Sequence, residues 1–277
     1  PLHRGLDCLE VNTSNSQIDG ALSRVKFPLI FSIAVPEAAT SFLLPTQWNQ
    51  SYGVVFLGLQ KGFEISRVLD HGKGYKKGDF LVSLKGQSKE EISNLVSTLT
   101  NRPTFLNAPF EGQTRSISLP KIGLVETIFH DMDAGWTRYI LDSYHVPFTV
   151  LKPADITEKK LSDFDVVILP NSNKDLLLEA KRKGSGGTYS LPSYDPALLK
   201  GMGKKGQSDL MKFIDEGGVV LSWGQSTELF MGMQTIQRSK DEKEEFLFPV
   251  RNIGPDLAKE GLAMPGSLLK IELKSDH

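Results

Sequence analysis

Hydrophobic residues in the second half of the chain form short runs separated by amphipathic stretches. The runs lie near residues 121–126, 147–151, 165–169 and 218–222. Continuously apolar runs are typical of strands that are buried on both faces. Between them, residues 134–144 and 206–216 place apolar side chains at helical spacings of three and four. Strands that alternate with helices predict an α/β fold with a doubly wound, mostly parallel sheet, here over residues 118–230.

The first half has a less regular pattern, and it predicts a smaller α/β domain. Residues 46–60 have helical spacing, and Ser88 begins a capping-box sequence for a helix after it. Three segments have strand-like patterns: residues 27–36, 63–69 and 80–84.

Two polar stretches interrupt these patterns. Residues 102–116 contain two prolines and predict a linker, so we expect one domain over residues 1–110 and a second over 117–277. Residues 184–194 are rich in Gly, Ser and Tyr and predict a long loop.

Composition narrows the classes of partner and environment. Lys plus Arg number 32 and Asp plus Glu 33, and this balance does not favour a nucleic-acid partner. A single cysteine, Cys8, excludes an internal disulfide. No run of about 18 apolar residues is present, so we expect no membrane span. Because the chain begins at Pro1 and ends soon after a strand-like run, we expect it to be a piece of a longer protein.

The loop and helix start after the first strand of the predicted parallel sheet form the first candidate ligand site. Ligands of such sheets bind at the carboxyl ends of the strands. The candidate ligand-binding residues here are His130, Asp131, Asp133, Trp136 and Arg138. A structural role is the alternative, because carboxylates at a helix start cap its free N–H groups.

These residues do not predict a metal site. Zinc needs three protein ligands that converge on one point. His145, the next candidate ligand, lies beyond a helix about 16 Å long, at about 1.5 Å per residue, so it does not converge with His130 and Asp133. We expect no metal and no cofactor.

Ser226 is a further candidate, because it follows the fourth strand of the predicted sheet. A nucleophile elbow has the pattern Gly-x-Ser-x-Gly, and here Glu228 replaces the second glycine. Only His277 lies downstream as a histidine partner. We therefore expect Ser226 to cap a helix, and we keep an atypical hydrolase site, at Ser226 or near Asp131 and Asp133, as the alternative.

Several segments resemble one family. They are Met132–Arg138 (Met-Asp-Ala-Gly-Trp-Thr-Arg), Phe164–Pro170, Phe213–Gly218 and Met264–Leu269 (Met-Pro-Gly-Ser-Leu-Leu). Together they resemble the class I glutamine amidotransferase-like, flavodoxin-like domain at the C-terminal side of bacterial zinc carboxypeptidase-like proteins. Residues 51–84 resemble the connecting α/β segment of the same proteins.

Two departures define what this resemblance implies. The elbow region holds Trp223-Gly224-Gln225 where an amidotransferase has its cysteine, and no histidine has Glu three residues later, as a zinc carboxypeptidase requires. The resemblance therefore implies an accessory region with no catalytic residues of its own. It also implies a periplasmic or extracellular location, with an upstream peptidase-like domain of the same protein, or a peptide or small-molecule ligand, as the partner.

A peptide-binding module is the remaining alternative. Residues 75–87 resemble a PDZ-domain core, although a helical pattern precedes them where PDZ domains have strands. The strand order over residues 50–100 bears on this hypothesis.

Overall fold

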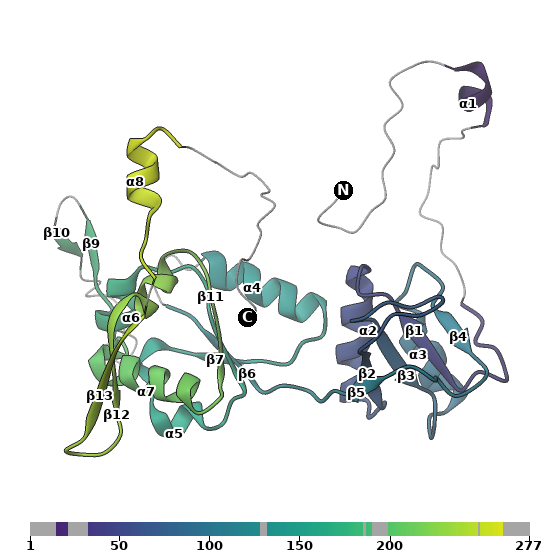
Figure 1. Ribbon diagram of the computed structural model, residues 1–277, viewed down its shortest axis with the longest axis horizontal. Coiled ribbons are helices and arrows are strands. Elements are labelled where there is room, and N and C mark those ends of the chain that lie inside the picture. Colours follow the sequence, from purple (N-terminus) through teal and green to yellow (C-terminus); the bar gives the residue numbers. More distant parts are fainter. Residues whose placement is uncertain are drawn as a thin grey trace. The chain divides into compact units, whose positions relative to one another are not determined.

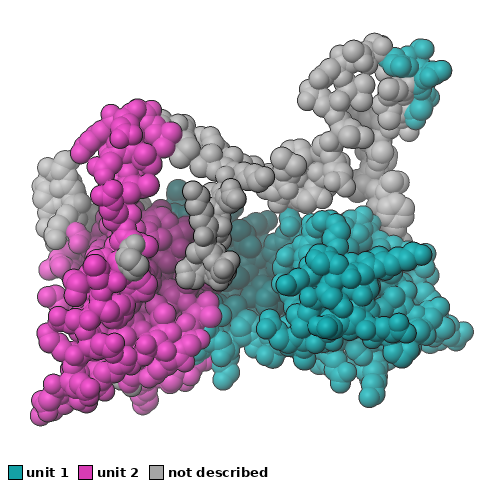
Figure 2. Space-filling view, viewed as in Figure 1, with its two compact units in different colours: residues 1–124, 132–150, 164–166 teal, residues 125–131, 151–163, 167–277 magenta. Residues whose placement is uncertain are grey.

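The protein is described here from a computed structural model. It describes residues 15–21, 33–127, 132–184, 187–189, 199–248 and 250–262. Contacts divide the chain into two compact units (Figure 2). Unit 1 comprises residues 1–124, 132–150 and 164–166, and unit 2 comprises residues 125–131, 151–163 and 167–277.

A five-stranded antiparallel sheet forms the centre of unit 1 (Figure 1). Its strands are β1 (Ser41–Leu44), β2 (Ile65–Val68), β3 (Phe80–Ser83), β4 (Thr104–Leu106) and β5 (Thr114–Ser116), in the order β4-β1-β3-β2-β5. In the central pair, Leu43 lies opposite Leu81. β4 and β5 form where a linker was predicted, and that prediction is wrong. These are the two edge strands, each only three residues long, and edge strands are often very short.

Two helices pack on this sheet and complete its core. They are α2 (Asn49–Gln60) and α3 (Lys89–Val96), and both confirm the helices predicted from spacing. The Ser88 capping box is also confirmed, because the Ser88 hydroxyl accepts from Glu91 N and the Glu91 carboxylate accepts from Ser88 N. These hydrogen bonds from Ser88 lower the pKa of Glu91. Of the predicted strand over residues 27–36, residues 33–36 form no strand, and the rest lies outside the described residues.

A buried carboxylate joins two loops of this unit. Asp79 precedes β3 and is 6% exposed. Its oxygens accept hydrogen bonds from Lys76 N at 2.8 Å, Thr46 N at 3.1 Å and Thr46 Oγ1 at 3.4 Å. One side chain thus satisfies backbone donors of its own turn and of the connection between β1 and α2.

The predicted parallel sheet is confirmed. Its strands are β6 (Ile122–Val125), β7 (Thr149–Leu151), β8 (Val166–Leu169) and β11 (Val219–Ser222), in the order β11-β8-β6-β7. The order reverses at β6, because β7 lies on one side of it and β8 on the other. A crevice for ligands forms at such a reversal, outside the carboxyl ends of the strands.

The remaining elements are short apart from two helices. Those two are α4 (Met132–Ser143) and α7 (Gly203–Asp215), which confirm the helices predicted at 134–144 and 206–216. The others are α1 (Ser16–Ala21), η2 (Pro153–Asp155), α5 (Glu158–Leu161), α6 (Lys174–Glu179), η4 (Gly224–Phe230) and α8 (Gly254–Lys259). β9 (Arg182–Gly184) pairs antiparallel with β10 (Gly187–Tyr189), and β10 lies where only a loop was predicted.

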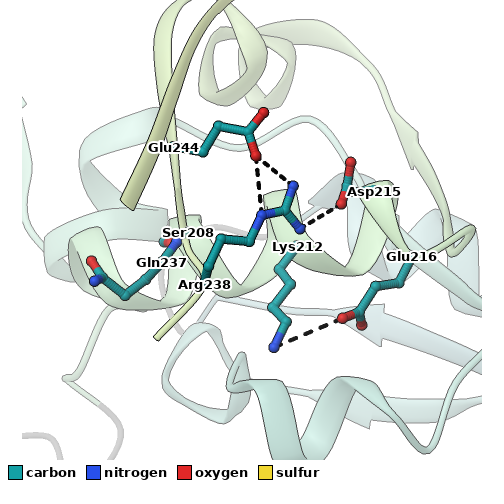
Figure 3. A network of polar contacts seen from close by, with 7 residues as sticks. All are labelled: Ser208, Lys212, Asp215, Glu216, Gln237, Arg238 and Glu244. Atoms are coloured by element: carbon teal, nitrogen blue, oxygen red, sulfur yellow. Dashed lines mark hydrogen bonds and ion pairs between the residues drawn. The ribbon is translucent and has the colours of Figure 1, made fainter. Parts of the chain in front are cut away.

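A longer hairpin packs on α7 in unit 2. It consists of β12 (Gly232–Gln237) and β13 (Lys243–Phe248), and its inner face buries Gln234 and Ile236. Arg238, just after β12, contacts both α7 and β13 (Figure 3). Its Nη1 donates to Asp215 at 2.6 Å, and its Nη2 and Nε donate to one oxygen of Glu244 at 2.6 and 3.0 Å. The hydrogen bonds to Asp215 and Glu244 raise the pKa of Arg238 above its ordinary value.

We expect Arg238→Ala to loosen the hairpin, because it removes the guanidinium that bonds both Asp215 of α7 and Glu244 of β13. Hydrogen exchange of the backbone amides in residues 232–248 should become faster, and the difference from the unmodified protein should shrink at high salt. The control is Lys243→Ala, which removes an ion pair within β13 alone. Equal exchange rates in the two variants would contradict this role.

Candidate functional site

The candidate site in unit 2 is the carboxyl edge of the parallel sheet. The loop Pro170–Asn173 leaves β8, and Trp223 leads from β11 into η4. β8 and β11 are neighbours, so both segments emerge at the same edge.

Ser226 joins these two segments. Its side chain is fully buried. The hydroxyl donates to Pro170 O and accepts a hydrogen bond from Ser172 N at 2.9 Å. We call this arrangement the Ser226 bridge. The expectation that Ser226 caps a helix is wrong, because the N-cap of η4 is Trp223 and Ser226 lies inside the element.

Amide side chains add further bonds around the Ser226 bridge. Asn171 Oδ1 accepts from Gln225 N at 2.9 Å, and Asn173 Nδ2 donates to Gln225 Oε1 at 3.4 Å. Asn173 Oδ1 also accepts from Asp175 N at 2.8 Å, which caps α6. Gly224 has φ +61°, and a Cβ there would collide with the Asn171 side chain. Only glycine fits this close approach without strain.

This geometry has a direct chemical consequence. A nucleophilic serine needs an exposed oxygen within reach of a base. The Ser226 oxygen is enclosed and already bonds two backbone groups of the β8 loop. A substrate could reach it only after the loops of β8 and β11 separated.

The other candidate residues do not lie around the Ser226 bridge in the described part of the chain. His130 and Asp131 lie outside the described residues. Asp133, Trp136 and Arg138 lie on α4, in unit 1. Trp136 is 66% exposed and meets Tyr139 edge to face, with ring centroids 6.1 Å apart. The structure therefore does not place these three residues in the same unit as Ser226.

Within the described ranges, no three His, Cys, Asp or Glu side chains are grouped so as to hold a metal ion. His145 lies just beyond α4 and ends it with φ +56°, in the left-handed region that commonly follows a helix. Likewise, no helix in the described part of the chain is long and apolar enough to cross a membrane.

The segment with the look of a PDZ core forms β3 and the turn that leads to α3. Its strand lies between β1 and β2 in the antiparallel sheet, and helix α2 precedes β2. The helix predicted over residues 46–60 is therefore present as α2, which comes before β2 and β3 in the chain.

Comparisons with protein-family models, with curated proteins and with solved structures find no match to the chain.

Sequence reasoning missed Asn171, Asn173 and Gln225. The available signal was an Asn-Ser-Asn sequence directly after a buried apolar strand, with a Gly-Gln sequence after the next strand of the sheet. Such residues fold back onto local backbone groups where a chain leaves a strand.

We expect Ser226→Ala to lower the free energy of unfolding by about 1–3 kcal/mol, because it leaves Ser172 N and Pro170 O buried without this partner. Urea unfolding followed by circular dichroism measures the change. Thr227→Ala is the matched control, since its exposed hydroxyl bonds only within η4. A Ser226→Ala loss no larger than that of the control would show that the bridge is not a main restraint.

Proposed function

We propose that the chain is a non-catalytic, amidotransferase-like accessory region of a zinc carboxypeptidase-like protein, and that it packs against the peptidase-like domain of that protein. The observation that carries the proposal is the Ser226 bridge. The position after β11, where such a fold would present its nucleophile, holds a buried hydroxyl that joins two loops.

The sheet supports the proposed fold type. The order β11-β8-β6-β7 has the reversal that a doubly wound, flavodoxin-like sheet requires next to its first strand. We accordingly propose the doubly wound arrangement for this sheet, with the crevice beside the ends of β6 and β8.

The outer face of β11 supports packing against another domain. Val219 and Leu221 alternate along the strand, Trp223 continues the series, and they are 48%, 50% and 38% exposed. Parallel sheets are normally covered on both faces, so an apolar strand face that is half exposed fits a docked neighbour. Because all three side chains are uncharged, the surface favours an apolar face of a folded domain.

The absence of catalysis is tested with the purified chain. We expect no release of ammonia from glutamine and no cleavage of peptides or simple esters above a protein-free blank, because the Ser226 oxygen is enclosed. Turnover that disappears in Ser226→Ala, while that variant remains folded by circular dichroism, would favour the hydrolase hypothesis.

Packing is tested by titrating the chain with the separately expressed peptidase-like domain of the parent protein. We expect Leu221→Lys to weaken this association at least about tenfold in calorimetry, because a charge would be buried in an apolar contact. Leu247→Lys is the matched control, on β13 of the same unit and 64% exposed. Equal weakening in both variants, or no association of the unmodified chain, would contradict the proposed packing.

A further inference from the structure

A groove of about 760 Å³ lies between α2 and α4, and both helices belong to unit 1. Aromatic side chains dominate its lining, with Tyr52 and Phe56 from α2 and Tyr139 and Tyr144 from α4 and the turn that follows it. None of the lining residues is Asp, Glu, Lys or Arg. This volume falls in the range of pockets that hold small ligands or short peptide segments.

Direct contacts hold the two sides of the groove. Gln60, at the end of α2, donates from Nε2 to His145 O at 2.6 Å and to Phe56 O at 3.0 Å. Next to it, Gly53 lies against Tyr144, since a Cβ at Gly53 would be 3.7 Å from Tyr144 Cδ1. A Cβ at this distance would be in ordinary van der Waals contact with the ring, so the two sides of the groove lie close together at Gly53.

The groove presents several hydrogen-bond donors that have no partner among the described residues. Gln50 Oε1 already accepts from Thr100 N and Thr100 Oγ1, both at 2.9 Å, which leaves the Gln50 NH₂ group as a donor. In the part of the chain that the structure describes, no hydrogen bond involves the hydroxyls of Tyr52, Tyr139 or Tyr144. A ligand matched to this groove is uncharged, has flat apolar rings and presents carbonyl oxygens.

We propose that this groove binds a proline-rich peptide segment in the polyproline II conformation. Proline residues have apolar rings and no backbone N–H, so the segment is rich in acceptors and poor in donors. Polyproline II has no internal hydrogen bonds, and its carbonyls remain available to the tyrosine hydroxyls and the Gln50 amide. Aromatic-lined grooves bind such segments at a small entropic cost, because the peptide is already extended.

Other ligand classes fit less well. A charged peptide would find no counter-charge in the lining. An oligosaccharide presents hydroxyls that donate and accept, as the tyrosine hydroxyls also do, so the cellohexaose titration below distinguishes it. A second copy of the chain would use the exposed apolar side chains of α4, and it is distinguished below by its dependence on protein concentration.

The test is calorimetric titration of the full chain with a capped decaproline peptide. We expect saturable one-to-one binding, and we expect Tyr139→Ala to weaken it roughly tenfold through loss of ring packing. Tyr139→Phe, which removes only the hydroxyl, should weaken it roughly threefold. Tyr139 is 64% exposed, so both variants should keep the melting temperature of the unmodified chain.

The controls separate this groove from nonspecific association. Asp142→Ala changes an exposed residue of α4 that does not line the groove, and it should leave binding unchanged. A capped Gly-Ser decamer of the same length should not bind. No decaproline binding, equal binding of the Gly-Ser peptide, or equal weakening by Asp142→Ala would overturn the proposal. Binding of cellohexaose without decaproline, or dimerisation that Tyr139→Ala abolishes without decaproline binding, would also overturn it.

Discussion

A chain that leaves a buried strand carries backbone N–H and C=O groups that need partners, and this constraint decides the arrangement of both units. In unit 1, the Asp79 carboxylate satisfies Lys76 N, in the turn before β3, and Thr46 N, in the loop after β1. In unit 2, the Ser226 hydroxyl satisfies Pro170 O and Ser172 N, more than fifty residues earlier in the chain. Each bond holds a loop at a fixed distance from the next strand, and the side chain that makes it is removed from contact with solvent.

The elements that the sequence predicted best are those with uninterrupted local patterns. Val166–Leu169 has an apolar run that suits its place between β11 and β6, and Val219–Ser222, at the edge of the sheet, has a similar run. The polar segment 102–116 was misread, because β4 and β5 are only three residues long and all three residues of β5 are exposed, so neither shows an apolar alternation. The strand Lys243–Phe248 was not predicted for a similar reason. Its first three residues are charged, and its pairing partner, β12, lies across a turn.

The candidate site was harder to predict than the fold, since its key contacts join residues that are distant in sequence. Local rules assign Ser226 to a helix cap, and they cannot indicate that a loop 54 residues earlier needs its oxygen. Asp133, Trp136 and Arg138 were grouped by their nearness in sequence, and α4 carries all three. A helix directs its side chains around its whole circumference, so nearness in sequence does not by itself indicate a shared face, and the ligand-binding role of these residues stays a prediction.

The two apolar surfaces invoked in the proposals differ in a way that separates their proposed partners. The β11 face is aliphatic, with Trp223 at its end, and a strand surface of this kind suits a broad, apolar contact with a folded domain. The α2–α4 groove is concave, and its rings carry hydroxyls, so it can both enclose an extended segment and bond its carbonyls. A folded domain presents few free carbonyls to such donors, since its backbone groups are paired internally. The chemistry of the two surfaces therefore favours the folded partner proposed for β11 and the extended peptide proposed for the groove.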